Sequence, residues 1–250
     1  MAMVRWLFLG VLLELLTLFS SPGDLSRISI YNMKFINEIL DTHNRYRSDV
    51  QPRASDMLFL SWDDGLAKTA RAWSRICKFS HNPDMSKFGK GHPEFDFIGE
   101  NMYVSPVDAF TVRNSLNVWH QEMNNFNYHT NKCDGSCDNY TQMIWASSYK
   151  IGCALHFCGR GIQDFNRNPG TIFICNYGPP GNDRISKPYN IGVPCFGCPE
   201  ETCTNRLCSK AKREFIKRYH KWSPKYSLAS IFFCNQPLLL TSIIAAYILQ

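Results

Sequence analysis

The sequence predicts a mixed α/β fold held together by disulfide bonds. Three segments carry apolar residues at helical spacing, and residues 150–158 and 171–177 are rich in β-forming residues. Ten of the eleven cysteines lie between Cys77 and Cys208. The hydrophobic fraction of 44% is sufficient to fill the core of one medium-sized domain with extensions at its ends.

The helices are predicted from apolar periodicity. The first covers residues 33–50, and the second follows Ser61, which can serve as its N-cap. A glycine- and proline-punctuated loop over residues 79–97 leads to a short extended piece. A third helix is expected over residues 107–125, with four inward-facing residues: Val112, Leu116, Trp119 and Met123.

Residues 138–158 form the central element of the predicted domain. Tyr140, Ile144 and Trp145 lie on one face of a short helix, and a strand that contains two cysteines follows. We expect this helix and strand to form the floor of a polar cleft.

The regions outside the core have distinct compositions. Residues 1–22 are expected to be a secretory signal peptide, with Arg5 ahead of a leucine-rich run. The main domain is assigned to residues 31–182. Residues 187–208 form a cysteine-rich hinge that has too few large apolar residues to build a core. In an oxidising compartment, the eleven cysteines predict five disulfides and one unpaired residue, Cys234.

The positive net charge is confined to one segment. Residues 209–227 hold seven lysines and arginines against Glu214 alone, and the rest of the chain is neutral overall. This basic stem predicts anionic lipid head groups or glycans as neighbours, or else a solvated linker, and outside the cell it argues against nucleic acid. Residues 228–249 carry no charge and are expected to be a membrane tether, either a transmembrane helix or a glycolipid-anchor signal.

Seven short segments of the chain carry a family resemblance when they are taken together. They are His43–Arg47, Cys77–Asn82, Gly99–Tyr103, Trp119–Glu122, Tyr140–Trp145, Lys150–Cys153 and Phe173–Gly181. In this order they resemble the CAP superfamily of cysteine-rich secretory proteins, antigen 5 and plant pathogenesis-related proteins, and most of all its glioma-pathogenesis-related-like branch.

The resemblance implies a three-layer α-β-α sandwich, the CAP domain, followed by the small disulfide-bonded hinge. It also implies the disulfide pairing, which sequence reasoning alone leaves open. The implied pairs are Cys77–Cys158, Cys153–Cys175, Cys133–Cys137, Cys195–Cys203 and Cys198–Cys208.

The family has two histidines and two glutamates in its central cleft. His81, Glu100 and Glu122 match three of these positions, and Asn139 occupies the fourth, where the family has histidine. Because an amide oxygen is a poor zinc ligand, we expect no resident cofactor beyond a weakly held divalent cation, with His81 as the candidate ligand. The favoured interpretation makes Glu100 and Glu122 structural carboxylates, hydrogen-bonded to His81 and backbone amides, that join helix to loop; metal coordination and catalysis are the alternatives. His156 is interpreted as a packed or surface histidine.

Asn139 also begins the acceptor sequence Asn-Tyr-Thr for N-glycosylation. Because Asn139 is expected at a helix start, as an N-cap, we expect low occupancy by a glycan.

Three hypotheses for function follow. The first is a non-enzymatic recognition protein, secreted or tethered at the extracellular face of a membrane, that binds extracellular or cell-surface proteins. The resemblance implies a reproductive or innate-immune setting. The second is sterol or lipid binding, with three candidate contacts in the loop: Phe88, Phe95 and Phe97. The third is a weak hydrolase that uses His81, Glu100 and Glu122.

Overall fold

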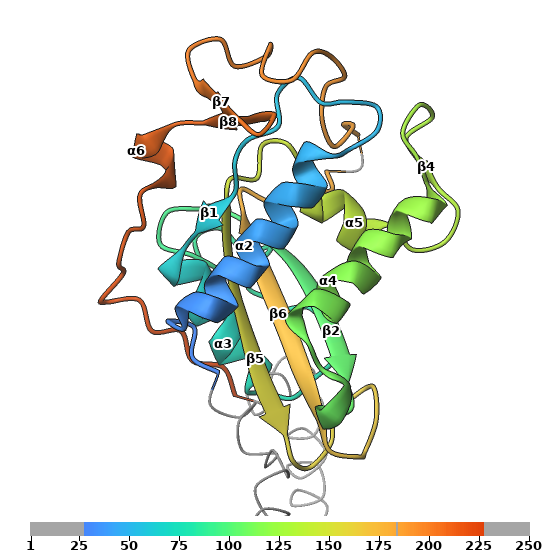
Figure 1. Cartoon of the computed structure of the whole chain (residues 1–250). Helices are drawn as coiled ribbons and strands as arrows, with labels where there is room; N and C mark the ends of the chain where they lie inside the picture. The colour runs from blue at the N-terminus through green and yellow to red at the C-terminus, as the bar shows by residue number, and fades with distance from the viewer. Residues whose placement is uncertain (1–27, 184, 228–250) are drawn as a thin grey trace, which may run out of the picture.

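The computed structural model describes residues 28–183 and 185–227 and shows a three-layer α-β-α sandwich (Figure 1). The expected signal peptide and hydrophobic tail lie outside the described residues. The central sheet has the strand order β1-β5-β6-β2, in which only the β1–β5 pair is parallel. Its strands are β1 Ser61–Trp62, β2 Gly99–Ser105, β5 Lys150–Cys158 and β6 Gly170–Gly178.

Helices cover both faces of the sheet. Helices α2 (Met33–Ser48), α4 (Val112–Gln121) and α5 (Asp138–Met143) pack together on one face, and α3 (Asp64–Ser74) covers β5 and β6 on the other. The predicted three-layer fold is therefore confirmed. β6 is buried along its whole length because it lies between these two helical layers.

The second helix has a different N-cap from the predicted one. Ser61 belongs to β1, and the Asp63 side chain accepts a hydrogen bond from the Leu66 amide at 2.9 Å. Asp63 is buried, and it also accepts a hydrogen bond from the buried His92 at 3.0 Å. The cap therefore fixes both the helix start and the loop that carries His92.

The third helix is shorter than predicted. Thr111 accepts a hydrogen bond from the Asn114 amide at 3.0 Å and so starts α4, after a separate 3₁₀ turn, η2 (Val107–Ala109). A second 3₁₀ turn, η3 (Glu122–Asn125), follows α4. The change of helix type turns Met123 outward, where it is 42% exposed, so its inward assignment was wrong.

The central element consists of α5 and β5, as predicted. A Cβ atom on Gly152 would lie 2.1 Å from the Ala67 nitrogen, so this glycine allows α3 to approach the sheet closely. Cys153 and Cys175 lie directly opposite each other in the β5–β6 ladder and form a disulfide. A second bridge, Cys77–Cys158, ties the far end of β5 to the loop after α3.

Arg47 holds the connection between α5 and β5. Its guanidinium is buried on α2 and donates to five backbone carbonyls, those of Leu58, Met143, Trp145, Ala146 and Ser148. Burial lowers the pKa of Arg47 to about 9, so the group stays charged at neutral pH. One side chain thereby satisfies the carbonyls of a loop that forms no regular structure of its own.

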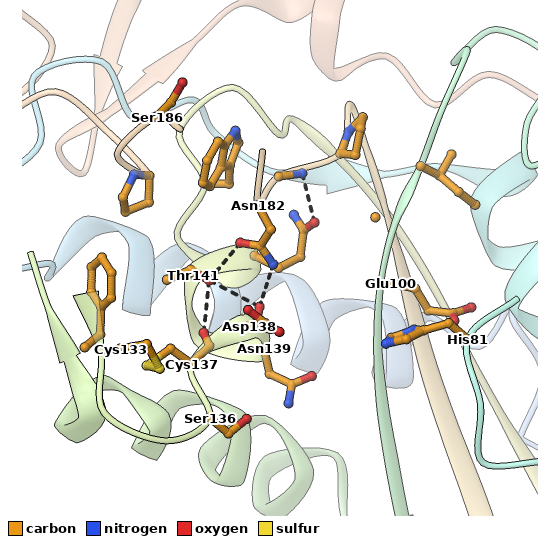
Figure 2. A pocket seen from close by; sticks show the side chains of 18 of the residues that line it. His81, Glu100, Cys133, Ser136, Cys137, Asp138, Asn139, Thr141, Asn182 and Ser186 are labelled. Carbon is orange, nitrogen blue, oxygen red and sulfur yellow. Dashed lines mark hydrogen bonds and ion pairs between the residues drawn. A yellow bond between two sulfur atoms is a disulfide. The ribbon is translucent and has the colours of Figure 1, made fainter. Parts of the chain in front are cut away.

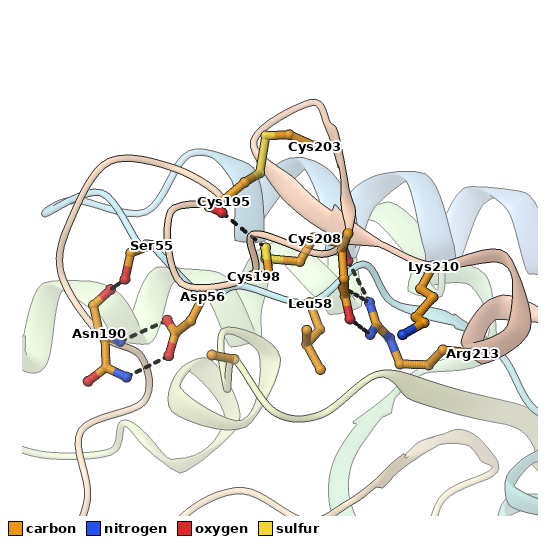
Figure 3. The surroundings of a disulfide bond; sticks show 12 residues. Ser55, Asp56, Leu58, Asn190, Cys195, Cys198, Cys203, Cys208, Lys210 and Arg213 are labelled. Carbon is orange, nitrogen blue, oxygen red and sulfur yellow. Dashed lines mark hydrogen bonds and ion pairs between the residues drawn. A yellow bond between two sulfur atoms is a disulfide. The ribbon is translucent and has the colours of Figure 1, made fainter.

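The hinge is docked on the domain. Its disulfides are Cys195–Cys203 and Cys198–Cys208, and its hairpin consists of β7 (Thr202–Thr204) and β8 (Leu207–Ser209). Figure 3 shows these bridges above residues 55–58, with which the hinge exchanges backbone hydrogen bonds. The fifth bridge, Cys133–Cys137, lies ahead of α5, close to the short β3–β4 pair (Phe126–Asn127 and Lys132–Cys133). All five are the pairs that the resemblance implies.

The basic stem also packs against the domain. We call residues 210–227 the strap; it contains α6 (Ala211–Glu214) and runs beside α3, at the left of Figure 1. The Trp222 indole donates to the Thr69 hydroxyl at 3.0 Å, and the Tyr226 hydroxyl accepts from the Asn82 side-chain nitrogen at 3.0 Å. The solvated-linker interpretation was therefore wrong.

Candidate functional site

A polar cleft of about 730 Å³ lies beside the N-terminal end of α5. One wall is formed by β2 and the loop that carries His81, and the other by α5 and the segment after β6 (Figure 2). The Thr141 hydroxyl donates to the Asn182 side-chain oxygen at 2.7 Å, and the Asn182 amide donates to the Asp138 carbonyl at 2.9 Å. These bonds join the segment after β6 to the helix.

His81 and Glu100 form a pair at one side of the cleft (Figure 2). The buried Glu100 carboxylate bonds His81 Nδ1 and the Asn82 backbone amide, both at 3.0 Å. With the Asn176 side-chain amide assigned in the orientation that satisfies its neighbours, its nitrogen donates to the second Glu100 oxygen at 3.2 Å. The hydrogen bond to Glu100 raises the pKa of His81. The His81 side chain is 65% exposed, so its ring remains accessible from the cleft.

Glu122 does not line the cleft. Its carboxylate accepts four hydrogen bonds: from the Asn139 backbone at 2.9 Å, the Asn139 side chain at 2.7 Å, the Tyr140 backbone at 3.2 Å and the Ser136 hydroxyl at 3.2 Å. Two of these donors are free N–H groups of the first turn of α5. Glu122 therefore acts as a capping carboxylate for α5, and the structure does not bring it together with His81 and Glu100.

Asn139 lies in the first turn of α5, and the N-cap position belongs to Cys137. The Asn139 side-chain nitrogen, to which a glycan would be attached, is held by Glu122. The Asn139 carbonyl accepts from the Asn101 side chain at 2.9 Å, and Asn101 also donates to the buried Tyr177 hydroxyl at 3.2 Å. Low glycan occupancy at Asn139 stays a prediction, now supported by this engaged side chain.

The cleft does not fit a tightly bound zinc ion. Glu122 is occupied by helix donors and Asn139 offers only an amide, so the cleft supplies His81 Nε2 as a single free imidazole ligand. Within residues 28–183 and 185–227, three clustered metal-ligating side chains occur only at Cys195, Cys198 and Cys208, whose sulfurs form disulfides. His156 is partly buried on β5, outside the cleft lining.

The three candidate lipid-contact residues separate into two groups. Phe95 packs on His92 and Tyr149, with ring centroids 4.8 and 5.8 Å apart, and covers Gly178. Phe88 and Phe97 are 71% and 44% exposed and meet edge to face at 6.2 Å. The pair therefore presents apolar surface to solvent, whereas Phe95 fills a structural gap.

Sequence reasoning missed the strap contacts. For Glu122 it anticipated a structural carboxylate bonded to backbone amides, but not that these amides belong to the first turn of α5. The inward spacing of Tyr219, Trp222 and Tyr226 among basic residues was an available signal for the strap. Within residues 28–183 and 185–227, no helix has the length and apolar character required to cross a membrane.

Comparisons with known proteins identify relatives of the whole domain. The model of the cysteine-rich secretory protein family, CAP, matches residues 40–177. Over 216 residues the chain is 40% identical to GLIPR1-like protein 1 of Bos taurus, with 86% of this chain and 87% of the relative covered. Glioma pathogenesis-related protein 1 of Mus musculus is 39% identical over 192 residues, covering 76% and 71%. The solved structure of BmVAL-1 has a TM-score of 0.55 and 25% identity, over 77% of this chain and 99% of that one.

Proposed function

This chain belongs to the CAP family of cysteine-rich secretory proteins, and on that premise we propose that it is a non-enzymatic recognition protein acting outside the cell. Its ligand surface consists of the cleft and its rim. Five disulfides support an oxidising, extracellular location. The reproductive or innate-immune setting implied by the resemblance stays a prediction, as does the tether.

The engagement of Glu122 carries the proposal. A hydrolytic site needs a general base within reach of a water or hydroxyl, and a zinc site needs several free ligands. Here Glu122 holds the first turn of α5. Glu100 is buried against His81, Asn82 and Asn176. These carboxylates support fixed cleft walls, which suit binding of a partner by shape and hydrogen bonds.

The test pairs an activity screen with a metal titration of the full chain. In the activity screen, we expect no hydrolysis of ester, peptide or glycoside substrates that depends on Glu100, with Glu100→Gln as the comparison. In the calorimetric titration, we expect weak zinc binding. Asn139→His is expected to raise zinc affinity only modestly, since Glu122 remains engaged by the backbone of α5. Hydrolysis that disappears with Glu100→Gln, or tight zinc binding by the unmodified protein, would contradict the proposal.

Lipid binding is a second candidate, supported by the exposed Phe88–Phe97 pair. Met85, from the same loop as Phe88 and Phe97, and Ile98, which directly follows that loop, both line the cleft. We expect Phe88→Ala/Phe97→Ala to weaken saturable binding of a fluorescent sterol. The matched control is Phe79→Ala/Phe165→Ala, which removes another edge-to-face pair. Equal losses in both variants would remove this candidate.

A further inference from the structure

A second cavity of about 710 Å³ lies between the strap and the domain. We call it the strap pocket. Its lining combines five cationic and three acidic side chains: Lys150, Lys210, Lys212, Arg213 and Lys217 with Asp63, Glu94 and Glu201. Figure 3 shows two of these cations, Lys210 and Arg213, beside the hinge disulfides.

The three carboxylates of the strap pocket are already engaged. Asp63 caps α3 and bonds His92. Glu201 pairs with both terminal nitrogens of Arg213, and Glu94 pairs with Lys217 and accepts a hydrogen bond from the Tyr219 hydroxyl. Glu94 and Glu201 are each paired with a cation, whereas Asp63 pairs with no lysine or arginine among the described residues and acts on Lys150 from beyond ion-pair distance.

Three of the cations have no carboxylate partner at ion-pair distance within the described ranges: Lys150, Lys210 and Lys212. The buried Lys150 ammonium donates to the Ser61 hydroxyl and the Phe215 carbonyl, both at 2.9 Å. An ammonium has three N–H donors, so one remains. Burial lowers the pKa of Lys150, and Asp63, Glu214 and Glu94 offset this only in part and without direct contact, so an anion bound against the ammonium would stabilise its charge further.

The remaining walls are flat and partly apolar. Phe95, Tyr149 and Phe215 line the strap pocket, and Tyr149 lies beneath the Arg213 guanidinium, 6.0 Å from the ring centroid. Lys68 donates to the Tyr219 carbonyl at 2.8 Å, which holds the strap in place over the pocket. The cations are therefore displayed on a fixed frame.

We propose that the strap pocket binds a sulfated sugar of an extracellular glycan. Sulfate supplies the anion for Lys150, Lys210 and Lys212, and the aromatic walls accommodate the sugar ring. Clusters of basic residues recognise sulfated glycans through such charge-assisted contacts. A planar bilayer surface does not reach into a concave pocket, whereas one sugar of a flexible chain does. The inference goes beyond the proposed function and uses none of the cleft residues.

The test uses the full chain and a heparin-derived tetrasaccharide as the probe, at physiological salt. Lys210→Gln/Lys212→Gln is expected to raise the Kd measured by calorimetry roughly tenfold, because two charge-assisted contacts are lost. Lys221→Gln/Lys225→Gln removes the same charge from exposed positions of the strap outside the pocket, and should change the Kd less than about twofold. Lys150→Met removes the buried cation and should raise the Kd as well, with thermal unfolding as the control for folding.

Three results would overturn the proposal. Equal losses in the two double variants would indicate general electrostatic attraction between the strap and the probe. Undiminished binding of a desulfated tetrasaccharide would show that sulfate is not the group recognised. Binding to phosphatidylserine-containing vesicles without binding to the tetrasaccharide would assign the charge to a membrane.

Discussion

Removing the Glu122 carboxylate is expected to destabilise the protein without releasing a metal ion. Glu122→Ala removes four accepted hydrogen bonds and leaves the Asn139 and Tyr140 backbone amides of α5 without their partner. Loss of a helix cap costs about 1–2 kcal/mol, and hydrogen bonds to a charged acceptor lie at the upper end. We therefore expect the free energy of unfolding to fall by about 2 kcal/mol, or about 4–8 °C in Tm for a domain of this size.

The assay is urea unfolding of the full chain with its disulfides intact, followed by tryptophan fluorescence. Glu122→Gln keeps one acceptor oxygen and loses the charge, so it should fall between Glu122→Ala and the unmodified protein. The matched control is Glu200→Ala, an exposed glutamate at the hinge, which should leave stability within about 0.5 kcal/mol. Unchanged stability in Glu122→Ala together with a loss of bound zinc would refute the capping argument and place Glu122 in the cleft.

Three further predictions concern groups outside the cleft. Burial lowers the pKa of His43 to about 4, so the unfolded chain takes up the proton first as the pH falls below about 6.5. Stability should therefore drop by about 3 kcal/mol between pH 6.5 and 4, and His43→Gln should flatten this part of the denaturation profile; parallel profiles would contradict the assignment. Arg47→Lys leaves at least two of five carbonyls unpaired and should lower the unfolding free energy by about 3 kcal/mol, whereas a loss below about 1 kcal/mol would show that water replaces the guanidinium. Trp222→Ala should release the strap and accelerate tryptic cleavage at Lys217 and Arg218 while the core stays folded, and an unchanged cleavage rate would show that the indole contact does not hold the strap.

Local patterns predicted the parts of the fold that depend on neighbours in sequence. Apolar spacing located α2 and α3 because each helix buries one repeating face. A high density of β-forming residues located β5 and β6, which are buried along almost their whole length. The errors arose where side-chain hydrogen bonds decide the boundary. Asp63 accepts the bond that Ser61 was expected to accept, and Thr111 caps α4, so that this helix starts after the expected position near residue 107.

The site was less predictable because its residues act across long sequence separations. His81 and Glu100 meet, as expected for neighbours in a cleft. Glu122 instead reaches the backbone of a helix 17 and 18 positions later, a contact that no local pattern contains. The strap was misjudged because charge dominates its composition, whereas three aromatic residues determine how it packs.

Arg47, on α2, fixes the connection between α5 and β5 and so helps to keep the cleft in shape. Five carbonyls pointing at one positive centre are the ligand type that calcium-binding loops provide for an ion from solution. Here the cation is covalently part of α2, so the cage around it forms together with the fold and cannot be emptied by a chelator. The floor of the cleft thereby keeps its geometry at any calcium concentration outside the cell.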